Sequence, residues 1–329
     1  GLGDITATIT NGTDTVNLTN CSEITSNDYR GATCTFPGGL AMGYYNVKLT
    51  SSWHSATYTL TNGFRIRDYR TLNSFTYMQD IPNSDVCENT PEATSTGANI
   101  VTLKDSRDQK QYKIAHLADG NCWMVQNLAL DGGRTLHTTD SNVTQDRVLP
   151  ANISDNTANQ LDRPQIYSGG ATTTNSYGSP YGNLYNWNAA TATLGNSSTP
   201  PASSIYESVC PKGWALPNPP SGNRSWPNLM QHQGLPSTNT WGGTDGANAV
   251  SSAQQAPLYM VLAGDYWYGN RSNATKLGHV WANTAIYNPE GSVNTAYYIE
   301  LDIPLKNFLP SGVWYSIAIG FSVRCVFGS

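Results

Sequence analysis

Six cysteines spread along the whole chain constrain the fold more than any other feature of the sequence. They are Cys21, Cys34, Cys87, Cys122, Cys210 and Cys325, and no two of them form the Cys-x-x-Cys pair that is typical of zinc or redox sites. An even and widely spaced set indicates three disulfides, which persist in oxidising compartments. The sequence therefore predicts an extracellular or cell-surface protein.

Neutral polar residues must cover most of the surface, because only 12% of the residues are charged while 38% are hydrophobic. This balance is typical of β-rich extracellular proteins. The 18 basic residues are spread thinly and the net charge is -5, so no basic stripe is present that could bind nucleic acid. No apolar run is long enough to span a membrane, and we expect any membrane attachment to use a segment outside this chain.

The length of 329 residues exceeds what one hydrophobic core usually serves, which favours two domains. Between residues 5 and 66, short segments alternate apolar and polar positions, as at Tyr45, Val47 and Leu49, and turns such as Asn62-Gly63 separate them. This pattern predicts a small antiparallel sandwich of the immunoglobulin type. The polar stretch 69–96 predicts an ordered connecting loop that a disulfide from Cys87 holds in place.

The remaining residues predict a loop-rich α+β domain. A hairpin is expected around Asp108-Gln109, because apolar residues alternate on both sides of this turn. Helical signals are few: they cover 184–192, a short turn after Ser225, and 253–262. Residues 131–179 are rich in Thr, Asn, Asp and Gly and predict mostly loop.

Several short sequence motifs near the start of the chain resemble those of a known family. In order, they are Ile9-Thr10-Asn11-Gly12, the spacing of Cys21 and Cys34, Thr35-Phe36-Pro37, Gly43-Tyr44-Tyr45-Asn46-Val47 and Leu60-Thr61-Asn62-Gly63-Phe64. Together they resemble a TIG/IPT domain over about residues 3–68. The resemblance implies an immunoglobulin-like spacer that carries no site of its own.

Longer sequence motifs further along the chain resemble those of another family. They are Leu117-Ala118-Asp119-Gly120-Asn121-Cys122-Trp123-Met124-Val125-Gln126-Asn127-Leu128, Tyr181-Gly182-Asn183-Leu184-Tyr185-Asn186-Trp187, Cys210-Pro211-Lys212-Gly213-Trp214-Ala215-Leu216-Pro217 and Gly320-Phe321-Ser322-Val323-Arg324-Cys325-Val326. In this order they resemble the Fibrobacter succinogenes major paralogous domain (FISUMP), whose fold is similar to that of C-type lectins. The resemblance implies a presentation scaffold without an established catalytic set.

The two resemblances complete the expected architecture: a mainly β immunoglobulin-like sandwich over 1–68, a disulfide-tethered connector over 69–96, and an α+β, loop-rich C-type lectin-like domain over 97–329. We predict that each disulfide stays within one domain. The predicted pairs are Cys21 with Cys34, Cys87 with Cys122, and Cys210 with Cys325.

Catalytic and metal sites have no recognisable context in the sequence. No Gly-x-Ser-x-Gly motif occurs, and the acidic residues are scattered. The histidines lack ligand spacing and are expected to be structural or solvated; they are His54, His116, His137, His232 and His279. Calcium-dependent sugar binding in C-type lectins uses Glu-Pro-Asn and Trp-Asn-Asp motifs. Here Asn288-Pro289-Glu290 is reversed and Trp281-Ala282-Asn283 lacks the acid. We expect no cofactor and no metal, with room only for a structural calcium.

Aromatic and Asn residues crowd the last quarter of the chain, where the sequence departs from the FISUMP pattern. Rigid aromatic side chains with small polar neighbours are typical of protein binding surfaces. The predicted binding residues lie in segment 266–271, in a loop at 283–288 and at a strand edge, and we expect Trp314, Tyr315 and Tyr287 to share one exposed face. They are Tyr266, Trp267, Tyr268, Asn270, Arg271, Asn283, Ile286, Tyr287, Asn288, Trp314, Tyr315 and Ile317.

These features predict a secreted or surface-displayed bacterial ligand-recognition protein, similar to an adhesin, rather than an enzyme. Its partner would be a protein or glycan on another cell or surface. Two alternatives stay open. One is a structural subunit of a surface layer or filament; the other is the variable protein of a diversity-generating retroelement, because such elements mutate C-type lectin-like domains near their C-termini.

Overall fold

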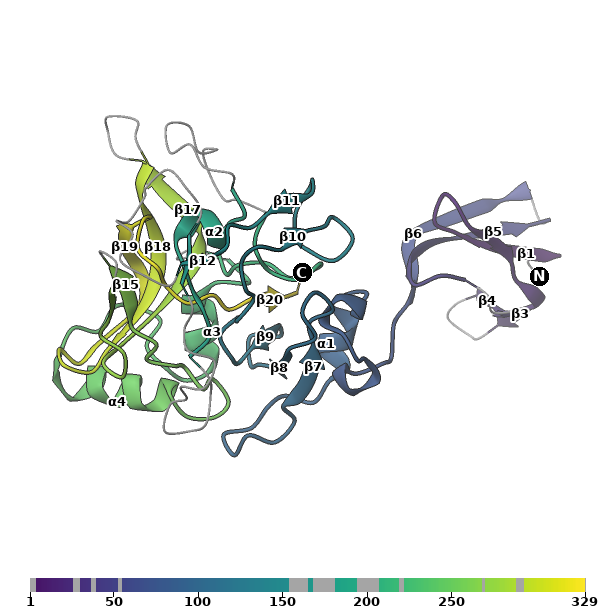
Figure 1. Ribbon diagram of the computed structural model, residues 1–329. Coiled ribbons are helices and arrows are strands. Elements are labelled where there is room, and N and C mark those ends of the chain that lie inside the picture. Colours follow the sequence, from purple (N-terminus) through teal and green to yellow (C-terminus); the bar gives the residue numbers. More distant parts are fainter. Residues whose placement is uncertain are drawn as a thin grey trace. The chain divides into compact units, whose positions relative to one another are not determined.

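A computed structural model describes residues 4–25, 30–36, 40–52, 55–153, 165–167, 181–193, 207–218, 222–267, 270–287 and 293–328. The chain is mainly β and divides into two compact units, Gly1–Tyr69 and Arg70–Ser329 (Figure 1). Residues 70–96 therefore belong to the second unit, whereas we had expected a separate connector up to residue 96.

The first unit consists of two small antiparallel sheets. One has the strand order β2-β1-β5-β6 and the other pairs β3 with β4. The strands are β1 (Ile5–Thr10), β2 (Thr15–Asn17), β3 (Thr19–Thr25), β4 (Arg30–Thr35), β5 (Gly43–Ser51) and β6 (Thr57–Ile66). The disulfide between Cys21 and Cys34 joins β3 to β4, as predicted.

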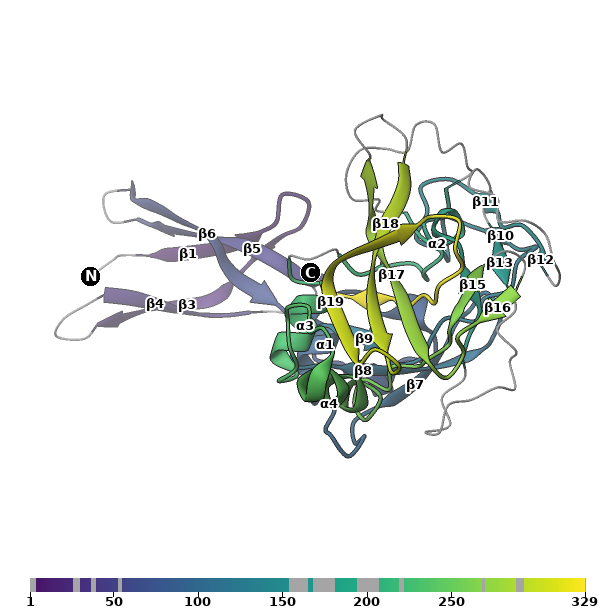
Figure 2. The same ribbon diagram turned by 90° about the vertical axis from the view of Figure 1, so that its left-hand side faces the viewer.

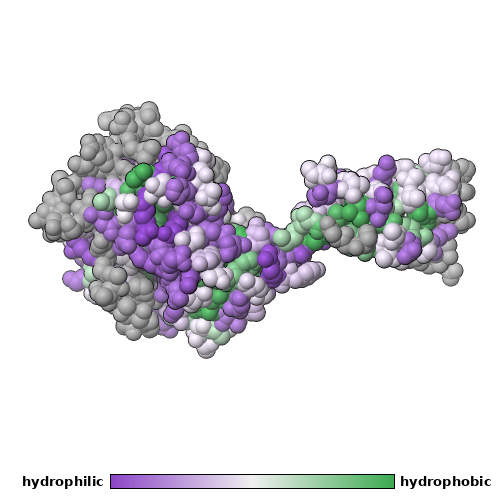
Figure 3. Space-filling view, turned by 45° about the vertical axis from the view of Figure 1, so that its right-hand side comes forward, coloured by the Kyte–Doolittle hydropathy of each residue, from purple (hydrophilic) through white to green (hydrophobic). Residues whose placement is uncertain are grey.

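The first unit buries few large side chains. Among its described residues, only Ala7, Ile9 and Tyr45 are buried hydrophobic residues. Large apolar side chains are exposed instead, and Figure 3 shows hydrophobic residues along the visible side of this unit. The exposed set is Phe36, Met42, Tyr44, Tyr58, Leu60 and Tyr69.

The second unit begins with short helical turns and one hairpin sheet. They are η2 (Leu72–Ser74), η3 (Met78–Asp80), α1 (Asp85–Asn89), β7 (Val101–Lys104), β8 (Gln111–His116) and β9 (Cys122–Met124). Strands β7 and β8 form the hairpin predicted around residues 108–109, with Leu103 paired to Tyr112. Strand β20 (Val326–Phe327), near the end of the chain, completes the sheet in the order β20-β9-β8-β7.

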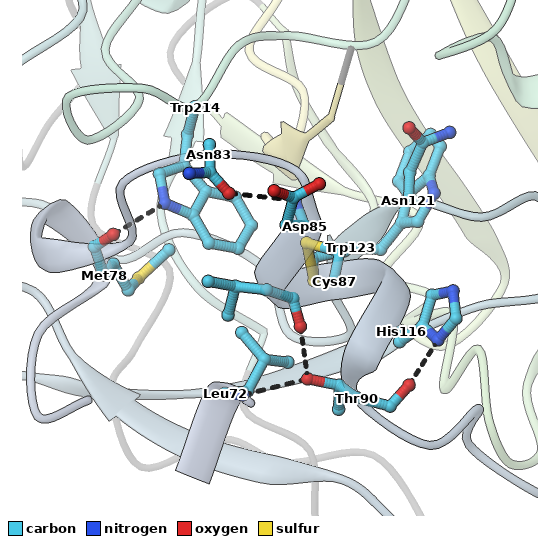
Figure 4. Close-up of a disulfide and its surroundings, with 12 residues drawn as sticks. Leu72, Met78, Asn83, Asp85, Cys87, Thr90, His116, Asn121, Trp123 and Trp214 are labelled. Carbon is cyan, nitrogen blue, oxygen red and sulfur yellow. Dashed lines mark hydrogen bonds between the residues drawn. A yellow bond between two sulfur atoms is a disulfide. The ribbon is translucent and has the colours of Figure 1, made fainter. Parts of the chain in front are cut away.

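The segment 70–96 is held against this sheet by buried contacts (Figure 4). Leu72, Met78 and Val86 are fully buried in the larger core cluster. The Thr90 hydroxyl donates to the Val86 carbonyl at 2.7 Å and accepts from the Leu72 amide at 2.9 Å. The disulfide between Cys87 and Cys122 links α1 to β9, so this segment is part of the core rather than a loop above it.

The middle of the second unit contains several very short elements. They are β10 (Thr135–Leu136), β11 (Arg147–Val148), β12 (Asn152–Ile153), β13 (Ile166–Tyr167), β14 (Leu184–Tyr185), α2 (Trp187–Ala190), α3 (Trp226–His232) and α4 (Gly243–Ala253). Helix α3 starts after Ser225, whose hydroxyl accepts a hydrogen bond from the Asn228 amide, as its sequence indicates. The helix expected over 253–262 is wrong, because α4 ends where it should begin.

The last part contributes the sheet that positions the site. Strands β17 (Leu277–Tyr287), β18 (Val293–Asp302) and β19 (Asn307–Ser316) are antiparallel neighbours, and β15 (Asp265–Trp267) pairs with β16 (Asn270–Ser272) as a hairpin beside them (Figure 2). Helices α3 and α4 pack against β19. The predicted loop at 283–288 is strand up to Tyr287.

The two faces of the β17-β18-β19 sheet serve two different core clusters, because successive strand residues point to opposite faces. Val280, Ile299 and Phe308 pack into one cluster, while Trp281 and Tyr298 pack into the other. The disulfide between Cys210 and Cys325 links two segments of this unit that are far apart in sequence and confirms the third predicted pair.

Three disulfides fit an oxidising extracellular environment. Among the described helices, the longest runs only from Gly243 to Ala253, and none has the length and apolar character needed to cross a membrane.

Candidate functional site

One face of the β17-β18-β19 sheet carries a row of aromatic and ionisable side chains. His279 pairs with Glu300 across β17 and β18, and Tyr298 stands two residues from Glu300 on the same strand. Because β-strand side chains repeat every second residue, these three point to the same face. Tyr315, which lies on β19, pairs with Ala296 of β18 and points to this face too.

The β15–β16 hairpin forms a wall beside this face. Asp265 and Trp267 are two residues apart on β15 and therefore point the same way, toward the sheet. Tyr266 lies between them and points away, where its ring stacks on that of Tyr167 at a centroid distance of 3.6 Å. The Asn273 amide group donates to the Asp265 carboxylate at 3.0 Å.

A pocket of about 340 Å³ lies between the hairpin and the sheet, within the size range of small-ligand sites. Its lining combines aromatic rings, two carboxylates, one histidine and small polar groups. The lining residues are Asp265, Trp267, Ser272, Asn273, Leu277, His279, Tyr298, Glu300, Tyr315, Ile319 and Phe321.

Four aromatic residues line the pocket, namely Trp267, Tyr298, Tyr315 and Phe321, and two of these rings meet the Tyr315 ring at steep angles. The Tyr315 ring meets the Trp267 ring at 5.5 Å and 72°, and the Tyr298 ring at 6.2 Å and 89°. Tyr298 is buried and Trp267 half-buried, whereas Tyr315 is 44% exposed. The rings thus line the pocket from its floor to its mouth.

His279 lies between the two carboxylates and is 5% exposed. Its Nε2 is 3.5 Å from the Glu300 Oε2, and its Nδ1 is 4.0 Å from the Asp265 Oδ2. The second distance is too long for a hydrogen bond. Among the described residues, His279 Nδ1 has no hydrogen-bond partner, although a buried polar atom normally has one.

Glu300 is held in its ionised form. Burial alone would raise the pKa of its carboxyl group, but hydrogen bonds from His279 and Tyr298 outweigh burial and lower the pKa below the ordinary 4.5. The Tyr298 hydroxyl donates to the Glu300 Oε2 at 2.8 Å. Burial, reinforced by the Glu300 charge, raises the pKa of Tyr298, so its phenol remains a neutral donor.

Of the predicted binding residues, Trp267 and Tyr315 line this pocket together. Arg271 is half-buried and is held by the backbone, because its guanidinium donates to the Ala263 carbonyl at 2.8 and 3.1 Å. Ile286 is half-buried on β17, where it pairs with Thr295.

Three predicted binding residues are buried, so the exposure that we expected for them is wrong. Tyr266 is 6% exposed because it occupies the inward position of β15. Asn283 is 5% exposed and its amide group donates to the Asn218 side chain at 2.9 Å. Ile317 is 1% exposed and packs in the larger core cluster.

Trp314 and Tyr315 do not share a face, contrary to our expectation of one surface. They are adjacent on β19 and therefore point to opposite sides of the sheet. Trp314 is 56% exposed and pairs with Tyr297. Tyr268 and Asn288 lie outside the described residues, as do the side chains of Asn270 and Tyr287.

The ionisable half of the site, namely Asp265, His279 and Glu300, was not predicted from the sequence. A signal was present, because His279 and Glu300 are polar residues inside apolar strand segments. A polar residue in such a position faces either solvent or a buried site, and only the register of the strands decides between them.

Gly320 controls the approach of the hairpin to the core. Its backbone exchanges two hydrogen bonds with Tyr266, at 3.0 and 3.1 Å. A Cβ atom at this position would lie 2.6 Å from the Tyr167 ring and 3.0 Å from the Tyr266 Cβ. Only glycine fits between the hairpin and the core at this distance.

A buried arginine lies four residues after Gly320. Arg324 is 1% exposed, and its guanidinium donates to the Asn127 side chain and to the carbonyls of Leu258 and Tyr259 at 2.6 to 2.8 Å. Burial lowers the pKa of Arg324 to about 9, so it stays charged at neutral pH. No carboxylate is among these partners.

The pocket can hold a small ligand through ring contacts, hydrogen bonds and negative charge. Within the described part of the chain, no group of three or more His, Cys, Asp and Glu side chains is arranged to hold a metal ion. Comparison with known proteins gave no match to any family model, any curated protein or any solved structure.

Proposed function

We propose that this chain is a secreted or surface-displayed bacterial ligand-recognition protein, similar to an adhesin, that binds its ligand in the pocket beside the β17-β18-β19 sheet. The observation that carries the proposal is the pocket of about 340 Å³ with aromatic walls and with a buried histidine nitrogen that has no partner among the described residues. A bound ligand can supply a hydrogen-bond partner for such an atom.

The proposed architecture is a TIG/IPT-like spacer in the first unit and a FISUMP domain of the C-type lectin-like class in the second. The ordered sequence phrases support this assignment. The first unit is a pair of small sheets, and the second combines several small sheets with loops and short helices, which is compatible with both expectations. The ligand-binding role of the second unit follows from its pocket and not from the fold.

Binding suits this pocket better than hydrolysis. Glycoside hydrolysis by paired carboxylates needs one carboxylic acid with a raised pKa, which can give a proton to the leaving group. The pKa of Glu300 is lowered, so Glu300 is a poor proton donor at neutral pH. An ionised carboxylate beside aromatic rings serves recognition directly.

The test is a screen of the full chain on glycan and protein arrays, followed by affinity measurements with variants. Trp267→Ala should weaken binding of each hit, because Trp267 lines the pocket. Trp314→Ala is the matched control: it removes an exposed aromatic ring from the opposite face of the same sheet. Hits that respond to Trp314→Ala and not to Trp267→Ala would place recognition elsewhere.

A structural subunit of a surface layer or filament is the second candidate function. It is favoured by the exposed apolar side chains of the first unit, including Tyr58 at 71% and Leu60 at 62% exposure. Light scattering over a range of protein concentrations separates the two candidates. A monomer at all concentrations supports ligand recognition, and growing assemblies support the structural role.

A further inference from the structure

We infer that the pocket takes an organic cation, the ammonium or guanidinium group of a small amine or of a Lys or Arg side chain. The inference rests on the proposed recognition function and names the chemical class of its ligand. It is drawn from the aromatic rings and two carboxylates that line a single cavity, and from one nitrogen that has no hydrogen-bond partner among the described residues.

The rings have the geometry that favours a positive charge. Trp267 and Tyr298 each meet Tyr315 at a steep angle, and all three rings line the same pocket. The face of an aromatic ring carries partial negative charge and attracts ammonium and guanidinium groups, most strongly when water is excluded. We call these three residues the aromatic cage.

The charges of the lining point in the same direction. Asp265 and Glu300 have side chains that are only 13% and 15% exposed, and no Lys or Arg is among the described residues that line the pocket. Within this described lining, His279 is the basic group that lies beside both carboxylates. His279 and Tyr298 stabilise the ionised Glu300, and a cationic ligand would add a positive charge beside both half-buried carboxylates.

Neutral ligands such as sugars would use the rings and hydrogen bonds but would leave this charge imbalance in place. A sugar gains from polar groups that both donate and accept, whereas the two carboxylates accept only. The lining therefore favours a ligand that donates from a charged group, which strengthens each hydrogen bond.

The first experiment compares two probes of the same shape and different charge by calorimetry: choline and its neutral analogue 3,3-dimethylbutan-1-ol. Choline should bind at least about tenfold more tightly. Glu300→Gln keeps the shape of the side chain and should weaken choline binding by at least about tenfold, with no change for the neutral analogue. Equal affinity for both probes would overturn the inference.

Variants of the cage separate a pocket effect from a structural one. Tyr315→Phe keeps the ring and should keep choline affinity, while Tyr315→Ala should lose about tenfold. Trp314→Ala should leave the affinity unchanged, since Trp314 points away from the pocket. Retained choline affinity in Tyr315→Ala would overturn the aromatic cage.

Two further probes identify the source of the cation. N-acetyl-lysine methylamide and N-acetyl-arginine methylamide represent the side chains of a protein partner, and choline represents a small amine; tighter binding in either arm supports the inference. If no cation binds but a sugar does, and Trp267→Ala abolishes that binding, the cation inference fails while the proposed recognition function stands.

Discussion

In the second unit, the buried Arg324 and the half-buried carboxylates of the pocket differ in how their hydrogen-bonding groups are satisfied. The Arg324 guanidinium donates to three oxygen atoms of the protein and is not among the residues that line the pocket beside the β17-β18-β19 sheet. Glu300 and Asp265 flank a histidine whose Nδ1 lacks a hydrogen-bond partner within the described residues, and all three border a cavity. Arg324 therefore stabilises the fold, whereas we propose that the pocket carboxylates interact with a ligand.

Charged groups differ in whether the protein itself fills their hydrogen-bonding capacity, and this difference indicates their role. A buried ionic group whose hydrogen-bonding capacity is filled by the protein stabilises one conformation. A buried group with unfilled capacity beside a cavity is costly for folding and is retained for function. The two kinds of site should respond differently to mutation: the first mainly in stability, and the second in binding with a smaller effect on stability.

The largest expected effect concerns the disulfide next to Arg324. Replacing Cys210 and Cys325 by Ser opens a loop with a sequence separation of 115 residues. The chain-entropy model predicts a loss of about 4.7 kcal/mol for a loop of this size. Urea unfolding of the second unit measures it, and ligand affinity of the folded fraction should be unchanged. Replacing Cys21 and Cys34 by Ser is the control and should affect only the first unit.

Arg324→Met should lower the free energy of unfolding of the second unit by about 3 kcal/mol or more. The change leaves the Asn127 side chain and the Leu258 and Tyr259 carbonyls without their donors, and each buried unsatisfied group costs about 1 to 3 kcal/mol. Thermal and urea unfolding measure the loss. An unchanged unfolding midpoint would remove the structural side of the comparison.

Trp267→Ala should weaken ligand binding by about 2 kcal/mol, as is usual for aromatic residues in the centre of a binding site. Its half-buried side chain lies at the edge of the core, so unfolding should change much less than in Arg324→Met. Calorimetry and thermal unfolding on the same samples compare the two quantities. A variant that unfolds without a binding defect in its folded fraction would make Trp267 a core residue.

Glu300→Gln should change the pH dependence of stability. The pKa of Glu300 is lowered in the folded state, so its ionised form contributes stability above the ordinary value of 4.5. That contribution is lost as the pH falls through the folded-state pKa. The stability difference between the wild type and Glu300→Gln should therefore shrink in acid, as unfolding curves between neutral pH and pH about 3 would measure. A constant difference would show that the carboxylate is not stabilised in the fold.

The smallest effect is expected from chelation. Treatment with a calcium chelator should leave ligand binding intact and at most lower the melting temperature by removing a structural calcium. Binding assays with and without chelator check this result. Loss of binding at unchanged fold would bring back a calcium-dependent lectin mechanism.

Covalent and local features could be predicted from the sequence. The three disulfide pairs were predicted with the help of short sequence motifs that contain or flank the cysteines, and the hairpin of β7 and β8 was predicted from its turn. Helix α3 was predicted from its capping Ser225 and the Pro227 in its first turn, because these signals act within one turn of helix.

The site itself could be predicted only in part, because strand alternation decides which of two neighbours faces a pocket. The crowding of aromatic residues indicated the right region, and Trp267 and Tyr315 line the pocket. Tyr266 and Trp314, their immediate neighbours, point the other way. Asp265, His279 and Glu300 come together through pairing of residues distant in sequence, which composition does not reveal.

The missing side chain of Gly320 has a consequence for how such a pocket could change during evolution. Gly320 is not among the pocket residues, yet it sets the separation between the β15–β16 wall and the core through its contacts with Tyr167 and Tyr266. Any larger residue there would push this wall outward and widen the opening while every contact residue stayed the same. Ligand size and ligand chemistry are thus encoded at separate positions, so selection could alter one without rewriting the other.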